Sequence, residues 1–245
     1  MVRMLYGIYY FLIVVPVFIV VTILTALTTI IGCLLGGEKY FSYYPGMLWS
    51  RLACILTLCP VKVKGRKNIQ KGQPYVVVAN HQSAFDIFMI YGYLGIRIKW
   101  VMKAGIGKIP FVGDACRAAG FVFVDNSSII AATKTVKDAE ACVRKGYSVV
   151  VFPEGSRTYT GKMVRFKKGA SQIALDTHLS ILPITLNGPY EVLPIHKLFV
   201  KPHRIEMIIH EPIPTEGIEK THKEMQDLAN RAQEVIRTGL WKQYL

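Results

Sequence analysis

No charged residue occurs between positions 4 and 37 of the chain; Arg3 precedes this uncharged run and Glu38 closes it. A helix needs about 20 apolar residues to cross the bilayer core, so the run is longer than one upright crossing requires. Pro16 lies inside it and lacks the backbone N–H that an unbroken helix uses. A cleaved signal peptide is disfavoured, because the apolar part of such peptides is shorter. We predict that residues 1–38 form a helical membrane segment, as one kinked span or as a hairpin of two shorter helices, and we favour the hairpin.

Residues 39–60 continue this apolar character, but their apolar part is too short to cross a bilayer. Trp49 and several tyrosines are typical of the headgroup level, so we expect an interfacial amphipathic helix or linker. An ordinary helix packed on the core is the alternative. A basic cluster without acids follows, made of Lys62, Lys64, Arg66, Lys67 and Lys71. Such a cluster predicts that the rest of the chain lies on the cytoplasmic side of the cell (inner) membrane.

The composition of the whole chain agrees with a membrane surface. The net charge is +14, from 30 Lys and Arg against 16 Asp and Glu, and 51% of the residues are hydrophobic. Anionic membrane lipids are the expected partners, because a nucleic-acid-binding protein this basic is rarely this apolar. The five cysteines show no paired CxxC spacing, which predicts neither a disulfide framework nor a zinc site.

From residue 61 onward, short runs of β-branched residues alternate with helical patterns. Residues 126–128 offer a helix N-cap, and Lys145-Gly146 offer a stop. The alternation predicts one α/β domain over residues 61–245, with a mostly parallel sheet flanked by helices. The predicted strands are 75–79, 98–102, 120–124, 148–152, 181–186 and 205–209, and the predicted helices are 83–93, 129–144, 168–178 and 218–240.

Two of the predicted strands end in polar residues. Residues 75–79 lead into Asn80-His81, and residues 148–152 lead into Pro153-Glu154-Gly155-Ser156-Arg157. In open α/β sheets, ligand sites gather at the carboxyl ends of the strands. We therefore expect a site where these two strands end.

His81 is followed five positions later by Asp86. If His81 lies in the loop and Asp86 in the first turn of the next helix, the two side chains can face each other. The pair can then act as a catalytic base with the carboxylate that orients it. An acid at a helix N-terminus is also favoured by the helix dipole, so a simple cap is the alternative for Asp86. A metal site is not expected, because the sequence offers too few further ligands.

The segment FPEGSRTYTGKMVRFKKGA (152–170) has the composition of an anion site. Pro153 and Gly155 shape a turn that exposes backbone N–H groups near Arg157. More cations follow before the next acid at Asp176, namely Arg165, Lys167 and Lys168. A guanidinium and ammonium groups beside a tight turn bind phosphate well. A solvated basic loop is the alternative.

Together, NHQSAFD (80–86) and FPEGSRT (152–158) resemble the hallmark blocks of the glycerolipid acyltransferases, and they are most similar to those of the 1-acylglycerol-3-phosphate acyltransferases. Two further segments, KAGIGKIPFVG (103–113) and ILPITLNG (181–188), resemble the second and fourth motifs of that family. The resemblance covers about residues 64–211. In many members the strand written FVFVDN here ends in an arginine that is thought to bind the phosphate of the acceptor, whereas this chain has Asn126.

The resemblance implies a reaction in phospholipid biosynthesis. A fatty acyl group passes from acyl-CoA or acyl-carrier protein to the sn-2 hydroxyl of 1-acylglycerol-3-phosphate (lysophosphatidic acid), which gives phosphatidic acid and needs no cofactor. His81 would be the general base and Asp86 its orienter; the acceptor oxygen attacks the thioester directly, so Ser83 is a cap and not a nucleophile. The implied substrate-binding residues are Lys103, Glu154, Gly155, Ser156, Arg157 and Lys167.

Two alternatives remain open at the level of the sequence. The change to Asn126 permits acyl transfer to another lysophospholipid or lyso-lipid, because it shifts phosphate binding onto Lys103, Arg157 and Lys167. A membrane lipid-binding protein without turnover is an alternative of a different class.

Overall fold

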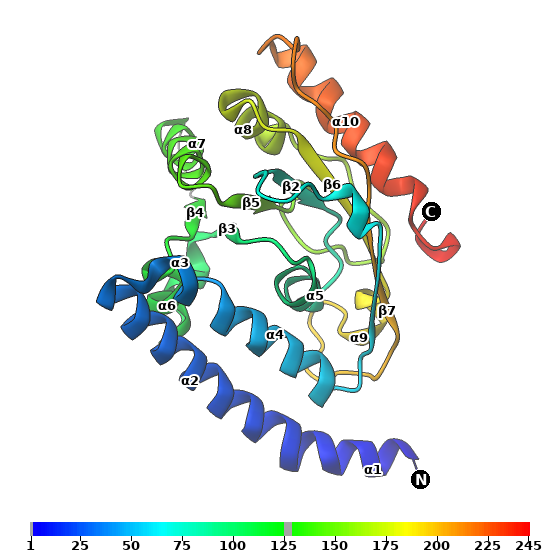
Figure 1. Cartoon of the computed structure of the whole chain (residues 1–245). Helices are drawn as coiled ribbons and strands as arrows, with labels where there is room; N and C mark the ends of the chain where they lie inside the picture. The colour runs from blue at the N-terminus through cyan, green and yellow to red at the C-terminus, as the bar shows by residue number, and fades with distance from the viewer. Residues whose placement is uncertain (1, 125–128) are drawn as a thin grey trace.

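The computed structural model describes residues 2–124 and 129–245, which form a seven-stranded sheet between layers of helices (Figure 1). The strand order is β1-β7-β6-β2-β5-β3-β4. Only β6 and β7 pair antiparallel among the strands of these residues, so the prediction of a mostly parallel sheet is confirmed. The strands are β1 (Val61–Lys64), β2 (Val76–Ala79), β3 (Ile98–Lys103), β4 (Val122–Val124), β5 (Ser148–Val151), β6 (Ile181–Asn187) and β7 (Ile205–Ile209).

Helices cover both faces of the sheet and enclose two hydrophobic cores. Alternate residues of β2 serve opposite faces, since Val77 and Ala79 belong to one core and Val76 and Val78 to the other. Because β2 is buried on both faces, its sequence is apolar at every position. Helices α4 (Tyr44–Leu56) and α5 (Phe85–Tyr93) lie on the side of the first core, and α7 (Ile129–Arg144), α8 (Gly169–Thr177) and α10 (His222–Thr238) lie on the side of the second (Figure 1).

The six predicted strands and four predicted helices are all present, with ends shifted by a few residues. The predicted N-cap at 126–128 lies outside the described residues, whereas the stop after α7 is confirmed by Gly146 with φ +79°. Sequence reasoning missed β1, because its lysines were assigned to the basic cluster. In this edge strand the lysines alternate outward, and Lys64 pairs with Glu206 at 2.8 Å. The remaining short helices are α6 (Val112–Ala118), α9 (Pro189–Val192) and the 3-10 turns Arg66–Asn68, Ala104–Lys108 and Lys242–Tyr244.

The uncharged N-terminal run is one long helix, so the hairpin predicted within residues 1–38 is wrong. α1 (Val2–Tyr9), a π-helical turn (Tyr10–Val14), α2 (Val15–Gly32) and a second π-helical turn (Cys33–Gly37) follow one another, and the backbone first departs from helical angles at Gly36, where φ is +83°. Pro16 does not break the helix, because it stands at the start of α2 directly after the wider π-helical turn. Within the described chain, one helical stretch is long and apolar enough to cross a membrane; it extends from residue 3 to residue 41 when the short helix after the bend at Gly36 is counted with it.

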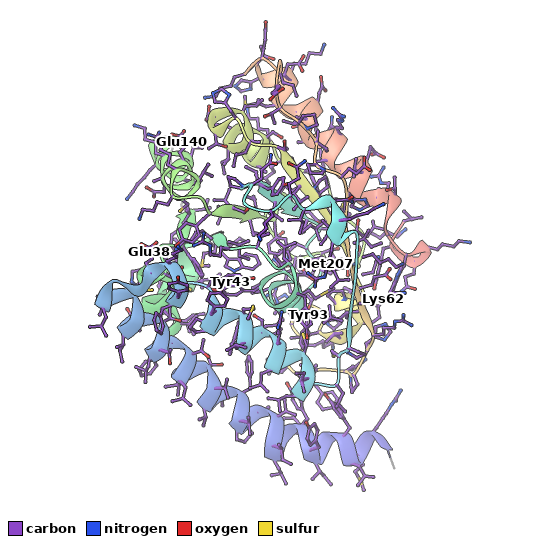
Figure 2. All side chains as sticks on the ribbon, viewed as in Figure 1. Glu38, Tyr43, Lys62, Tyr93, Glu140 and Met207 are labelled. Atoms are coloured by element: carbon purple, nitrogen blue, oxygen red, sulfur yellow. The ribbon has the colours of Figure 1, made fainter. Side chains whose placement is uncertain are left out.

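A short helix, α3 (Glu38–Phe41), reverses the chain, and α4 then returns between α2 and α5. The Trp49 indole donates a hydrogen bond to the Thr22 hydroxyl of α2 at 2.9 Å. On the opposite side, Gly46 lies against the Tyr91 ring of α5 so closely that a Cβ would be 2.3 Å from it. Residues 39–60, for which we predict an interfacial helix or linker, thus include a helix that packs on the domain, as in the alternative. Figure 2 shows how densely side chains fill the space between these layers.

Candidate active site

The predicted site residues meet at one edge of the sheet. β6, β2, β5 and β3 are neighbours that run in the same direction, so their carboxyl ends lie side by side. His81 follows β2, Glu154 follows β5, and Lys103 is the last residue of β3. The expectation that the polar ends of strands 75–79 and 148–152 adjoin is therefore met, because β2 and β5 pair directly.

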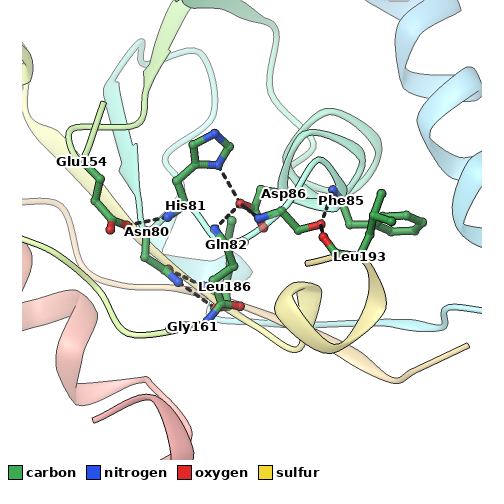
Figure 3. A network of polar contacts seen from close by, with 10 residues as sticks. Asn80, His81, Gln82, Phe85, Asp86, Glu154, Gly161, Leu186 and Leu193 are labelled. Carbon is green, nitrogen blue, oxygen red and sulfur yellow. Dashed lines mark hydrogen bonds and ion pairs between the residues drawn. The ribbon is translucent and has the colours of Figure 1, made fainter. Parts of the chain in front are cut away.

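The loop that carries His81 is fixed by the residue before it. The Asn80 side chain donates to the Leu186 carbonyl at 2.9 Å and accepts from the Leu186 N–H at 2.8 Å, so its amide continues the ladder between β2 and β6 (Figure 3). The His81 carbonyl in turn accepts the N–H of Thr158 at 2.9 Å, which joins the loop after β2 to the loop after β5. Sequence reasoning missed Asn80 as a contributor, although its position directly before the histidine was the available signal.

His81 and Asp86 form a hydrogen-bonded pair. His81 Nδ1 lies 2.7 Å from Asp86 Oδ2, and the Asp86 side chain is fully buried (Figure 3). The same oxygen accepts the backbone N–H groups of Gln82 at 2.6 Å and Ser83 at 2.8 Å. Asp86 stands in the first turn of α5, where the helix dipole favours an acid, and it holds the preceding loop and the imidazole at the same time. The two alternatives weighed for Asp86 are thus compatible.

Aromatic stacking sets the plane of the imidazole. The centroid of the Phe152 ring lies 3.9 Å from that of the His81 ring, with only 9° between the planes. Phe152 also stacks with Trp100 of β3, at 5.9 Å between the centroids. With Nδ1 bonded to Asp86 and one face covered by Phe152, the Nε2 atom is the part of the imidazole left for a substrate. Sequence reasoning read Phe152 only as the end of a strand, and the pattern gave no sign of the stacking.

Ser83 is held in a structural role. Its hydroxyl donates to the Leu193 carbonyl at 2.8 Å and accepts the N–H of Phe85 at 3.2 Å. Both partners are backbone groups at the start of α5 and after α9. This placement agrees with the prediction that Ser83 is a cap and not a nucleophile.

Glu154 joins two loops through its buried carboxyl group. Oε1 accepts the N–H of His81 at 2.6 Å, and Oε2 accepts the N–H of Val164 at 2.9 Å. Burial raises the pKa of the Glu154 carboxyl to about 7, and the nearby Asp86 charge adds to the rise. The sequence grouped Glu154 with the substrate-binding residues, whereas both of its oxygens are already occupied by backbone N–H groups.

The cations predicted to bind an anion are not neutralised by the protein. Arg157 is half-buried, while Lys103 and Lys167 are exposed, and none of the three has an ion-pair partner among the described residues. Gly155 has φ +79°, a backbone angle that favours glycine, and the Lys167 side chain lies directly over it, 2.9 Å from where a Cβ would be. Ser156 is exposed beside them. The predicted anion site therefore has unpaired positive charge next to the His81–Asp86 pair.

Other predicted features add little to the site. Asn126, the departure from the family pattern, lies outside the described residues. In the part of the chain that the structure describes, no group of three His, Cys, Asp or Glu side chains could hold a metal ion. Four cysteines are buried as free thiols, and Cys33 is half-buried in the N-terminal helix.

Comparison with known proteins gives a consistent result. The Acyltransferase family model matches residues 60–187. The chain is 32% identical over 178 residues to a chloroplastic 1-acyl-sn-glycerol-3-phosphate acyltransferase of Arabidopsis thaliana (72% of this chain, 49% of that protein). It is 30% identical over 179 residues to the human 1-acyl-sn-glycerol-3-phosphate acyltransferase alpha (73% of this chain, 62% of that protein). The chain thus spans about half the length of the plant relative.

A solved structure resembles nearly the whole chain. The crystal structure of the 1-acyl-sn-glycerophosphate acyltransferase PlsC from Thermotoga maritima superposes with a TM-score of 0.77 and 26% identity, covering 96% of this chain and 93% of that one. The likeness therefore includes the N-terminal helix as well as the sheet. Because the family match also extends over just more than half of the residues, the protein belongs to the Acyltransferase family.

Proposed function

We propose that this protein transfers a fatty acyl group from acyl-CoA or acyl-carrier protein to the sn-2 hydroxyl of 1-acylglycerol-3-phosphate and so makes phosphatidic acid. The observation that carries the proposal is the His81–Asp86 pair at 2.7 Å, placed at a sheet edge beside cations that have no ion-pair partner among the described residues. The relatives and the solved neighbour bear the name of this activity. A base next to unpaired positive charge suits an acceptor that carries both a hydroxyl and a phosphate.

The proposed chemistry needs no nucleophile from the protein. Asp86 holds the Nδ1–H of His81, so Nε2 takes the proton of the acceptor hydroxyl as its oxygen attacks the thioester carbon. The tetrahedral intermediate then collapses with cleavage of the C–S bond. The departing thiolate recovers the proton from the imidazolium, which the buried Asp86 carboxylate stabilises until then. The imidazole returns to its starting state.

The phosphate of the acceptor is assigned to the loop after β5. Arg157 offers a planar set of donors, and Lys167 lies directly above Gly155. Lys103 reaches the same edge from the end of β3. Glu154 acts as a positioning residue, because it joins the His81 backbone to the Val164 backbone and so keeps this loop at a fixed distance from the base.

We propose that the N-terminal helix lies along the membrane surface and does not cross it. Near its start, the Tyr9 hydroxyl donates to the Leu56 carbonyl at 2.9 Å, and beyond its end Glu38 pairs with the buried Lys99 of β3 at 3.0 Å. A helix tied to the α/β domain at both ends leaves one long side for lipid, and that side bears exposed apolar residues along its length. The basic residues after α4 favour the cytoplasmic side of the inner membrane.

The direct test is an acyl-transfer assay with the full-length protein in mixed micelles of detergent and lysophosphatidic acid. Thiol release from acyl-CoA and formation of phosphatidic acid are both measured, and acyl-carrier protein is supplied as the donor in a parallel assay. His81→Ala is expected to lower turnover about 10³-fold or more, since general-base catalysis contributes that order of rate. His222→Ala, which changes a histidine of the exposed start of α10, is the matched control and keeps full activity.

The outcome separates this proposal from its alternatives. Turnover with another lysophospholipid and none with lysophosphatidic acid would move the assignment to a different acceptor. Binding of lysophosphatidic acid without thiol release would indicate a lipid-binding protein. Near-normal turnover of folded His81→Ala protein would remove His81 from the role of base.

A further inference from the structure

The segment between α9 and β7 links the candidate active site to the N-terminal helix. At its start the Leu193 carbonyl accepts the Ser83 hydroxyl, and Ser83 also donates its N–H to Asp86. At its tip the Leu198 carbonyl accepts the Tyr10 hydroxyl of the N-terminal helix at 2.9 Å. In Figure 1 this gold segment reaches from α9 toward the end of α4 and α1. None of the chemistry proposed above uses the tip.

Leu198 is the most exposed of the large hydrophobic side chains in the described chain, at 91%. A single exposed leucine has no meaning by itself. Here, however, the Leu198 carbonyl is hydrogen-bonded to Tyr10 and the two residues that follow are packed in place. The Phe199 ring packs on Tyr10 at 5.0 Å and on Phe11 at 6.1 Å, and Val200 is buried. The leucine is therefore held outward by an ordered backbone.

The surroundings of Leu198 have the properties of a lipid-binding surface. Phe11, which contacts the neighbouring Phe199, is itself 62% exposed on the N-terminal helix, so the apolar surface of that helix continues onto this segment. Between Glu191 and Glu206 there is no acid. The exposed cations of this interval are Lys197, Lys201 and Arg204, and none has an ion-pair partner among the described residues.

We propose that residues 193–201 form a second membrane-binding element, in which Leu198 inserts into an anionic bilayer beside α1 while Lys197 and Lys201 contact the lipid headgroups. An apolar tip flanked by lysines fits the boundary between acyl chains and anionic headgroups. The inference rests on the proposed membrane position of the N-terminal helix. Because Leu193 is bonded to Ser83, insertion of the tip would fix the height of the His81–Asp86 pair above the lipid surface.

The insertion is tested by fluorescence on the full-length protein reconstituted in vesicles that contain anionic lipid. A cysteine is introduced by Leu198→Cys on a Cys33→Ala background and labelled with an environment-sensitive dye; the other four native thiols are buried. The matched control is Asn230→Cys, at an exposed position of α10 on the other face of the sheet. We expect the dye at 198 to show blue-shifted emission and quenching by lipids brominated on their acyl chains, whereas the dye at 230 is quenched by aqueous iodide.

Equal quenching of the two dyes by iodide, with no effect of brominated lipid at 198, would overturn the proposal. The signal does not depend on turnover, so insertion of residue 198 in a protein without acyl transfer would refute the proposed function alone. Insertion of residue 198 that accompanies normal acyl transfer supports both.

The basic residues are tested by the double change Lys197→Gln and Lys201→Gln in the labelled protein. Each lysine near an anionic surface favours binding by about fivefold, so the double variant should lose the gain in lipid quenching that anionic vesicles give over neutral ones. The control pair Lys223→Gln and Arg231→Gln removes the same charge from α10 and should keep this gain. An equal loss in both pairs would assign the effect to net charge and contradict a role for this segment.

Discussion

The ends of β2 and β5 lie side by side, yet the protein treats their polar groups in opposite ways. After β2, Asp86 is fully buried, and one of its oxygens accepts hydrogen bonds from His81, Gln82 and Ser83. After β5, Arg157 and Lys167 have no ion-pair partner among the described residues. The first group is fixed by the protein itself, whereas the described residues do not neutralise the second.

The difference suits the roles that we propose for the two regions. A base must keep one ring orientation before the substrate arrives, and the donors around Asp86 offset the cost of burying its charge. Cations that bind a phosphate gain most when no carboxylate competes for them. Glu154 connects the two regions, since it holds the backbone of His81 and of Val164 with one carboxyl group.

The comparison is tested most severely by Asp86→Asn. The amide oxygen can take the place of Oδ2, and the amide nitrogen can take that of Oδ1, which has no hydrogen-bond partner among the described residues. The fold should therefore survive, while the charge that stabilises the imidazolium is lost. We expect turnover to fall about 10³-fold with little change in the acceptor KM.

Asp114→Asn is the matched control for this prediction, because Asp114 also stands in the first turn of a helix but is exposed. It should leave turnover unchanged. If Asp86→Asn protein kept turnover within about tenfold of the parent, the loop after β2 would not depend on the Asp86 carboxylate for its function. The contrast between the two strand ends would then fail.

The connection between the two regions is tested by the pH dependence of stability in Glu154→Gln. In the folded protein the pKa of the Glu154 carboxyl is about 7, whereas in the unfolded chain it is near the ordinary 4.5. Because the folded state keeps the proton longer, this group favours folding below about pH 4.5, and its contribution is lost as pH rises through about 7. The loss amounts to at most about 3 kcal/mol of unfolding free energy.

Thermal unfolding in detergent between pH 4 and pH 8 measures this effect as the difference between variant and parent. Glu154→Gln should remove part of the fall in stability with rising pH, and the exposed Glu219→Gln should not. Parallel curves for Glu154→Gln and the parent would mean that burial does not raise the pKa of Glu154, and the carboxyl would then be an ordinary ionised tether.

Local patterns predicted the sheet well, and they also placed His81 at the end of a strand. Strand β2 could be read from four apolar residues, and the strand ends gave both His81 and Arg157, because parallel strands bring their carboxyl ends together. The roles of Asn80 and Phe152 could not be read in this way. Each depends on a partner from another strand or loop, Leu186 and His81, and no local period records such a contact.

The continuity of the N-terminal helix and the contacts of Glu154 could not be read from the sequence, for different reasons. Pro16 suggested a break, but the effect of a proline depends on the helix geometry around it, which here includes a π-helical turn. Glu154 looked like part of the anion site because it precedes Gly155 and Arg157 in the chain. Whether a carboxylate faces a ligand or two backbone N–H groups is decided by tertiary packing, so the sequence alone could not assign it.

The loop after β5 is tested by Arg157→Ala. A charge-assisted hydrogen bond to phosphate contributes roughly 1.5–3 kcal/mol, so we expect the KM for lysophosphatidic acid to rise about tenfold or more while turnover at saturation changes less. Arg157→Lys keeps the charge but loses the planar pair of donors, and it should give an intermediate KM. Arg231→Ala in α10 removes one positive charge far along the chain and is the control for net charge.

The two substrates distinguish the possible ligands of this cation. A raised KM for the acyl-CoA donor, with the acceptor KM unchanged, would assign Arg157 to the phosphates of CoA and contradict the acceptor assignment. With acyl-carrier protein as donor the same variant should still show the raised acceptor KM, because the acceptor is common to both reactions. If Arg157→Ala changed neither KM, the unpaired charge after β5 would not mark the binding region. The main distinction between the two strand ends would then be lost.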